Sequence, residues 1–285
     1  MPMTSARTVE VRVHDEAAEC RSVVFDWFAA EPVRHTMVLS VLSRLLGDPV
    51  VEAVMVTARE NGELRASVVR TGPWPLMVSG LPAELAGPVA GLLADVDPGL
   101  PGVIGPRGSA EAFAGAWARH TGASVREVSA GRLYELAGLR PPDAPGGMRL
   151  ATEADLPLLR GWLREFQRDA AGHTRGARRI DEKLRRSLAL GDGLAVWEVD
   201  GTPVSMASAS VPVADMSRVV SVYTPPGLRD RGYGSAITAA VSRWALDAGA
   251  RHVALFTDLA NPTANRIYRT IGYRPVLDTC ELEFG

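Results

Sequence analysis

The sequence predicts an α/β (α+β) protein made of two domains in tandem. Its 285 residues are 46% hydrophobic and 22% charged, which is enough apolar material for two ordinary cores. A segment rich in proline and glycine interrupts the chain near its middle, and the same order of strands and helices is expected on either side of it. Two unrelated α/β domains are the alternative interpretation.

The interruption runs from Arg140 to Gly147 and holds three prolines and two glycines in eight residues. Such a segment cannot continue a helix or a central strand, because proline lacks the backbone donor and fixes φ. The predicted organisation is therefore a first domain over residues 1–139, a linker over 140–147 and a second domain over 148–285.

The first half predicts a strand, two helices, a hairpin and then alternating strands and helices. Asn61–Gly62 is the hairpin turn, since this dipeptide readily adopts the positive φ values that a tight turn requires. The expected elements are a strand at 9–13, helices at 16–28 and 33–46, strands flanking 61–62, a strand at 76–78, a helix at 83–93, a strand at 102–104, a helix at 110–120 and two short strands within 125–136.

The second half repeats this order. Thr152 and Asp155 have the spacing of a capping box, and apolar residues then recur at helical spacing from Leu156 to Phe166. Asp200–Gly201 predicts another hairpin turn. The expected elements are a strand at 148–151, a helix that includes 156–166, a helix at 178–190, strands at 193–199, 203–211 and 218–224, a helix at about 233–248, a strand at 252–257, a helix at about 262–271 and a strand at 276–284.

The passage from Val222 to Ser235 carries the most specific signal. It places Arg229, Gly232 and Gly234 between a strand and a helix. Glycine lets the backbone approach a ligand closely, and the first helical turn offers unpaired N–H groups with partial positive charge. This arrangement predicts a site for phosphate oxygens.

Two common phosphate motifs do not fit the passage. A Walker A loop has lysine before its Ser or Thr, where this chain has Gly234. A dinucleotide fingerprint needs a third glycine and opens the first βαβ unit of a sheet, whereas a hairpin precedes this loop.

The pattern Arg-x-x-Gly-x-Gly instead resembles the pyrophosphate loop of the GNAT acetyltransferases. A second run supports the resemblance, because Asn261, Asn265, Tyr268 and the pair Gly272–Tyr273 follow the next strand in the order and at the separation of that family. The resemblance covers about residues 148–284. The phrase from Val222 to Gly234 looks most like the subgroup that includes glycine N-acyltransferases.

The resemblance implies a tandem GNAT protein, each domain a mixed, mostly antiparallel sheet flanked by helices, using acetyl-CoA or another acyl-CoA as co-substrate and no metal. It implies a splayed sheet beside the strand before the loop, and Tyr268 as the acid that protonates the departing thiolate. The expected coenzyme-binding residues are Val222, Tyr223, Thr224, Arg229, Asp230, Arg231, Gly232, Tyr233, Gly234, Ser235, Asn261, Asn265 and Tyr268.

The general base is less determined by the sequence. Asp258 follows a predicted strand at the end where ligands gather in α/β proteins, so it is the first candidate. Glu165, Asp169 and His173 lie on or after the first helix of the second half, and this helix often borders the acceptor cleft in the family. A chain of water molecules is an equal alternative.

The first half lacks these features. Ser79 to Glu84 stands where the glycine loop would be, with an acidic Glu84 that would repel phosphate, and Ala118 stands where the tyrosine would be. We therefore predict a degenerate first domain that binds no coenzyme and stabilises the second.

Composition limits the remaining partners. A formal net charge of -2 gives no general attraction to nucleic acid or to an anionic membrane, and two distant cysteines do not suggest a disulfide framework or a zinc site. With no signal peptide or membrane span apparent, we expect a cytoplasmic protein, monomeric or homodimeric. The expected function is N-acylation of a small-molecule amine or amino acid. A protein or peptide amine acetyltransferase, or a non-catalytic acyl-CoA sensor, is the alternative.

Overall fold

A computed structural model describes residues 8–14, 17–45, 53–171 and 177–285. The contacts divide these into two compact units. Unit 1 comprises residues 1–132, 258–260 and 276–285, and unit 2 comprises residues 133–257 and 261–275. The chain therefore returns to unit 1 with its last ten residues. This division differs from the expected partition at 140–147, because Leu133 to Gly147 belong to unit 2 and the final strand completes unit 1.

Unit 1 is built around an antiparallel meander followed by a parallel pair. Its elements are β1 (Val9–His14), α1 (Ala17–Ala29), α2 (Thr36–Leu45), β2 (Ala53–Glu60), β3 (Glu63–Thr71), β4 (Leu76–Gly80), a 3₁₀ turn (Ala83–Leu85), α3 (Ala86–Val96), β5 (Gly102–Pro106), α4 (Arg107–Thr121) and the first part of β6 (Val125–Leu136). The last part of β12 (Tyr273–Phe284) pairs antiparallel with β5, Thr279 opposite Pro106.

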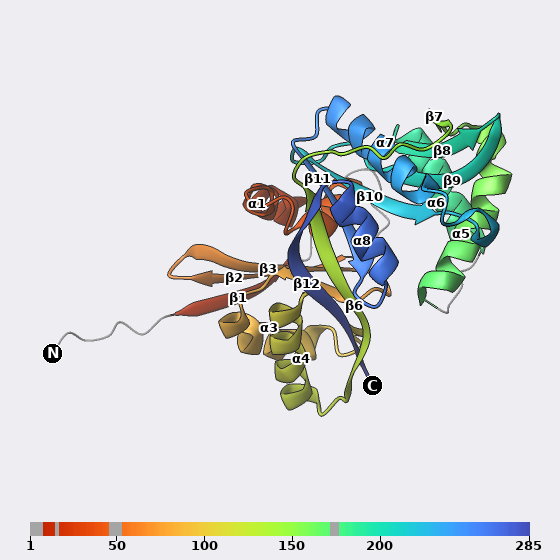
Figure 1. The fold of residues 1–285 in the computed structure, drawn as a ribbon. Coiled ribbons are helices and arrows are strands. Elements are labelled where there is room, and N and C mark those ends of the chain that lie inside the picture. Colours follow the sequence, from red (N-terminus) through yellow and green to blue (C-terminus); the bar gives the residue numbers. More distant parts are fainter. Residues whose placement is uncertain (1–7, 15–16, 46–52, 172–176) are drawn as a thin grey trace. The chain divides into compact units, whose positions relative to one another are not determined.

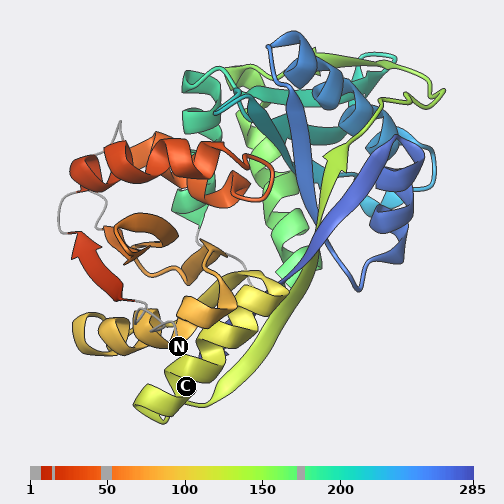
Figure 2. The same cartoon turned by 90° about the vertical axis from the view of Figure 1, so that its left-hand side faces the viewer.

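Within unit 1 the helices cover both faces of the sheet. α1 lies on one side of β2 and β3, and α3 and α4 lie on the other (Figures 1 and 2). The alternation of apolar residues along the hairpin explains this: Val56, Ala58, Ala66 and Val68 are buried in one cluster with the apolar residues of α3 and α4.

Unit 2 repeats this architecture. Its elements are β7 (Gly147–Leu150), a 3₁₀ turn (Glu153–Asp155), α5 (Leu156–Ala171), α6 (Ala177–Ala189), β8 (Gly193–Val199), β9 (Thr202–Ala209), β10 (Met216–Tyr223), a 3₁₀ turn (Pro226–Leu228), α7 (Tyr233–Asp247), β11 (His252–Asp258) and α8 (Pro262–Thr270). The strands from β7 to β10 pair antiparallel in chain order, and β10 pairs parallel with β11. The Thr152–Asp155 capping box is confirmed.

The two faces of this sheet bury different residues of the same strands. Ala195 and Ala207 pack in the cluster that contains the inner face of α7, where small side chains let the helix approach closely. Leu194, Val196 and Met206 point the other way and pack with the apolar stripes of α5 and α6. This period of two fixes α7 and the α5–α6 pair on opposite faces.

β10 and β11 are paired only along the first half of β10. Their pairing covers Met216 to Val219, opposite His252 to Leu255, and does not include Val220 to Tyr223. On the β9 side the register of β10 shifts between Val220 and Tyr223, where Ser221 has a φ of 57°. The second half of β10 therefore presents backbone groups without a β11 partner, as the resemblance led us to expect.

Most predicted elements agree with the observed ones to within a few residues. One is wrong: the two short strands expected within 125–136 form the single strand β6. The proline-rich segment 140–147 is irregular up to the start of β7, as its composition requires.

Candidate active site

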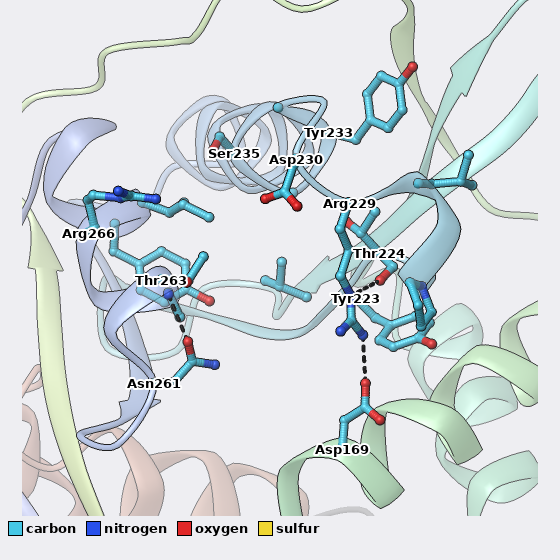
Figure 3. A pocket seen from close by; sticks show the side chains of 18 of the residues that line it. Asp169, Tyr223, Thr224, Arg229, Asp230, Tyr233, Ser235, Asn261, Thr263 and Arg266 are labelled. Carbon is cyan, nitrogen blue, oxygen red and sulfur yellow. Dashed lines mark hydrogen bonds and ion pairs between the residues drawn. The ribbon is translucent and has the colours of Figure 1, made fainter.

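A cavity of about 910 Å³ opens in unit 2 at the point where β10 and β11 diverge. The end of β10, the loop before α7, the first turn of α7, the C-terminal part of α5 and α8 enclose it (Figure 3). Its residues are Phe166, Asp169, Val222, Tyr223, Thr224, Pro226, Leu228, Arg229, Asp230, Gly232, Tyr233, Gly234, Ser235, Asn261, Thr263, Ala264, Arg266, Ile267 and Tyr268.

The loop wall of the cavity is shaped by residues with positive φ. Asp230 has a φ of 62° and Gly232, the N-cap of α7, has a φ of 81°, and no side chain caps the helix. The N–H groups of the first helical turn therefore have no acceptor within the helix or from a capping side chain. They form the positive end of the helix dipole, which favours an anion. A Cβ on Gly234 would stand 3.3 Å from Thr224 Oγ1, so the loop backbone and the strand end lie close together.

Hydrogen bonds fix the strand end that faces the loop. The Ser205 hydroxyl donates to the Tyr223 carbonyl at 2.8 Å, and its oxygen lies 2.9 Å from Thr224 Oγ1. Ser205 is fully buried on β9, so this anchor belongs to the core. It holds the end of β10 in place without occupying the side of the strand that lacks a β11 partner.

The α8 wall carries the tyrosine. Asn261 caps α8 by accepting from Ala264 N at 2.9 Å, so its amide side chain is committed to the helix start. Tyr268 lines the cavity with 8% of its surface exposed, and burial raises the pKa of its hydroxyl to about 12. Its ring packs between those of Tyr134 and Tyr273, with centroids 6.3 and 6.2 Å away.

Gly272, which forms part of the family-like run, has a structural reason to be glycine. Its φ is 107°, and a Cβ there would stand 1.9 Å from the Gly138 carbonyl oxygen. The turn that ends α8 is therefore packed directly on the backbone that follows β6, which fixes the direction of α8 and with it the position of Tyr268.

The helix α5 carries two carboxylates one helical turn apart, Glu165 and Asp169, and of these Asp169 lines the cavity. Glu165 Oε2 accepts from the Tyr223 hydroxyl at 2.7 Å, and Asp169 Oδ2 accepts from Arg229 Nη2 at 2.6 Å. Phe166 lies between them in sequence, and its ring meets that of Tyr223 edge-on. Burial first, and then the bond to Glu165, raise the pKa of Tyr223 to about 12.

All the residues expected to bind coenzyme line this cavity except Arg231 and Asn265. Asn265 instead accepts from the Tyr134 hydroxyl at 2.9 Å and donates to the Asn261 carbonyl at 2.7 Å, so it braces α8. Asp258, the first candidate base, accepts from Ala260 N in the turn after β11 and is not a lining residue. His173 lies outside the described residues.

Sequence reasoning missed several lining residues, among them Leu228, Thr263, Arg266 and Ile267. Thr263 and Ile267 are four residues apart and share a face of α8 with each other, but they lie five and one residues before Tyr268. A helical projection from Tyr268 would have pointed to Ala264 instead, four residues before it. Arg266 and Leu228 had no such signal, since an exposed arginine and an apolar loop residue are common.

The corresponding strand end of unit 1 is filled by its own side chains. Ser79 Oγ lies 3.0 Å from His35 Nδ1, and a Cβ on Gly80 would stand 2.7 Å from a ring atom of Phe28 and 2.8 Å from one of Trp27. All five residues of β4 are buried. Burial, then the charge of Arg34, lower the pKa of His35 to about 4, so it stays neutral in this packing.

Two further features are absent from the part of the chain that the structure describes, a metal-binding cluster and a membrane-spanning helix. No three His, Cys, Asp or Glu side chains there are grouped so that they could hold a metal ion. No helix among those residues is long and apolar enough to cross a membrane.

Comparisons with known proteins agree with this geometry. Residues 157–273 match the acetyltransferase (GNAT) family. An aminoglycoside N(6')-acetyltransferase type 1 of Salmonella typhimurium is 28% identical over 95 residues, which are 32% of this chain and 63% of that protein. The chain thus spans less than two thirds of that relative's length.

Two solved structures resemble the whole chain. A GNAT-family acetyltransferase from Colwellia psychrerythraea has a TM-score of 0.62 at 8% identity, covering 96% of this chain and 98% of that one. A tandem GNAT protein from the clavulanic acid biosynthesis pathway has a TM-score of 0.57 at 13% identity, covering 97% and 98%. These likenesses show the fold, two GNAT-like domains in tandem. Residues 157–273, the part of the chain that matches the acetyltransferase (GNAT) family, contain all the residues that line the cavity in unit 2.

Proposed function

We propose that unit 2 transfers an acyl group from acetyl-CoA, or another acyl-CoA, to a primary amine of a small molecule by direct attack of the amine on the thioester. One observation carries the proposal: the uncapped start of α7, the half of β10 without a β11 partner and the hydroxyl-bearing Tyr268 all line one cavity. A single molecule that carries phosphates, amides and a thioester can therefore contact all three features at once.

The residues present suit the coenzyme's parts in order. Gly232 and Gly234 carry no side chain that would keep a pyrophosphate out, and the start of α7 supplies N–H donors at the positive end of the helix. Val222 to Thr224 offer strand backbone to the amides of the pantetheine arm. Ala264 and Ile267 give the arm an apolar wall on the α8 side.

Catalysis then rests on positioning and on proton transfer. The amine must be neutral to attack, and a backbone N–H near the β10 end can stabilise the carbonyl oxyanion. The collapse of that intermediate breaks the carbon–sulfur bond, Tyr268 gives its proton to the leaving thiolate, and the attacking nitrogen loses one proton to water to leave a neutral amide. With a pKa of about 12, its hydroxyl holds that proton throughout the neutral range.

The acceptor is proposed to be a small amine. The match to a protein named for the acetylation of aminoglycosides favours this class over a protein or peptide amine, and over a sensor without turnover. A thiol-release assay with acetyl-CoA against pooled aminoglycosides, polyamines, amino acids and peptides tests the proposal. Absence of thiol release with every pool, from protein that binds acetyl-CoA, would favour the sensor.

Asp230→Asn is expected to tighten acetyl-CoA binding. The Asp230 side chain points into the cavity near the start of α7, where it would repel a pyrophosphate (Figure 3). Asparagine also tolerates the positive φ, so the loop should keep its shape. Removing one exposed like charge should lower Kd about two- to fivefold, less so in high salt, as calorimetry can measure.

Asp200→Asn is the matched control, since Asp200 also has a positive φ, in the β8–β9 turn, and is not a lining residue. Equal affinities for the wild type and both variants would mean that Asp230 does not face the phosphates.

We also expect one acetyl-CoA per chain. Unit 1 has ring and imidazole packing at its β4 end and no glycine loop, so a pyrophosphate would meet side chains there instead of free backbone N–H groups. Calorimetric titration of the full chain should give a stoichiometry of one, and the Gly234→Glu variant should show no residual binding. Two sites of similar affinity would contradict the assignment of unit 1 as degenerate.

A further inference from the structure

Arg229 opens the family-like loop, yet its side chain is bound to protein groups on two edges. Its Nε donates to the Thr224 carbonyl at 3.0 Å, and its Nη2 donates to Asp169 at 2.6 Å. The guanidinium also stands over the Tyr223 ring, 5.9 Å from the centroid. Figure 3 shows the guanidinium directed toward Asp169 of α5, away from the start of α7.

A second link runs in parallel. Tyr223 donates to Glu165, which lies one helical turn before Asp169 on α5. The two links tie α5 to both ends of the same short segment, because Tyr223 ends β10 and Arg229 begins the coenzyme loop. Raised to about 12, the pKa of Tyr223 keeps its hydroxyl protonated as a donor at neutral pH.

We propose that Arg229 is a positioning residue that acts through Asp169 and Thr224, not a ligand of the phosphates. Together with Tyr223 and Glu165 it braces the segment 223–229 against α5. The inference rests on the proposed function, since it concerns how the acyl-CoA loop is held. Its consequence is that α5, which lines the cavity through Phe166, and the coenzyme loop move as one piece.

The charges decide between a brace and a phosphate ligand. The carboxylate of Asp169 neutralises the guanidinium of Arg229. If Arg229 bound the phosphates of the coenzyme, it would first have to break this ion pair. In that case, removing the carboxylate would free the arginine and strengthen binding. If Arg229 instead braces the loop, removing the Asp169 carboxylate loosens the loop and weakens the binding of the coenzyme. The two roles thus predict opposite signs for a single substitution.

The test is calorimetric titration of acetyl-CoA into the full-length chain and its variants. With a brace, Asp169→Asn should weaken binding about two- to fivefold, the range for a partly exposed ion pair. Arg229→Gln should weaken it at least as much, and the double variant should be no weaker than Arg229→Gln alone, because both changes break the same link.

Arg229→Lys sharpens the test. Lysine keeps the positive charge that would attract a phosphate. It lacks the planar guanidinium, however, and cannot donate to Thr224 and Asp169 at the same time in the way that arginine does. A brace therefore predicts a loss close to that of Arg229→Gln, and a phosphate ligand predicts near-normal affinity. Asp181→Asn is the matched control, since it breaks the half-exposed Arg160–Asp181 pair between α5 and α6, and neither of these residues lines the cavity. It should leave acetyl-CoA affinity unchanged.

The outcomes separate the two proposals. If the wild type binds no acetyl-CoA, the proposed function fails first. If it binds, and Asp169→Asn binds equally or more tightly while Arg229→Lys is near normal, the brace is overturned and Arg229 is a phosphate ligand. A fall in melting temperature alone, without the change in affinity, would also overturn it, because that is what a purely structural pair would give.

Discussion

Gly234→Glu is expected to abolish acetyl-CoA binding in a folded protein. Gly234 is the second residue of α7, where a carboxylate suits the helix dipole and where glutamate is a better helix former than glycine. The substitution should therefore leave α7 intact while its carboxylate takes the place of a pyrophosphate oxygen. Calorimetry should show no measurable heat of binding, and circular dichroism should match the wild type.

Two controls separate charge from crowding. Gly234→Ala adds only a Cβ, which would stand 3.3 Å from the Thr224 hydroxyl, so a small loss of affinity is expected. Gly227→Glu places the same charge in the preceding 3₁₀ turn, where a Cβ meets nothing within 4 Å and the residue is not in the lining. Unchanged affinity in Gly234→Glu would end the assignment of this loop as the coenzyme site.

Tyr268→Phe is expected to lower kcat by about 10²- to 10⁴-fold, the usual contribution of a general acid, while acetyl-CoA affinity holds. The ring remains in its packing between Tyr134 and Tyr273, and only the proton donor is lost. Steady-state thiol release with the best acceptor from the pools measures kcat, and calorimetry measures binding.

Tyr273→Phe is the matched control for this substitution. Tyr273 is buried in the same cluster, but its hydroxyl lies 2.6 Å from Ser242 Oγ and it does not line the cavity. Losing that hydrogen bond should cost stability and spare kcat. A Tyr268→Phe variant as fast as the wild type would leave Tyr268 with a packing role only.

The pKa of Tyr268 gives this role a pH signature. A group whose pKa is raised to about 12 keeps its proton until the pH approaches that value, so the acid stays competent through the alkaline range. The kcat profile should therefore show no loss at the ordinary tyrosine value of about 10. An alkaline inflection near 10 that disappears in Tyr268→Phe would mean that the hydroxyl is less buried during turnover than in this structure.

Local patterns were sufficient for most elements and for much of the candidate site. The Asn61–Gly62 and Asp200–Gly201 turns, the Thr152–Asp155 capping box and the glycines before α7 are all decided within a few residues of chain. Short-range signals of this kind express backbone conformation, which depends on the residue itself and its near neighbours. They predicted the loop as a phosphate site, whereas the assignment of Tyr268 to the same site came from the resemblance to the GNAT family.

The tertiary structure decided which side chains face that cavity and which brace it. Nothing in the sequence distinguishes Asn265, which holds Tyr134 and the start of α8, from the lining residue Arg266 beside it. The pairing of Arg229 with Asp169 joins residues sixty positions apart, so no local pattern reports it.

The sequence by itself determined the order of elements, the glycine loop before α7 and the absence of such a loop from the first half. Only the tertiary structure decided that the last ten residues return to unit 1, since the pairing of β12 with β5 spans about 175 residues of chain. The physical reason is the same in each case. Backbone propensities act over a turn or two, whereas strand partners and ion pairs depend on distances that only the folded chain sets.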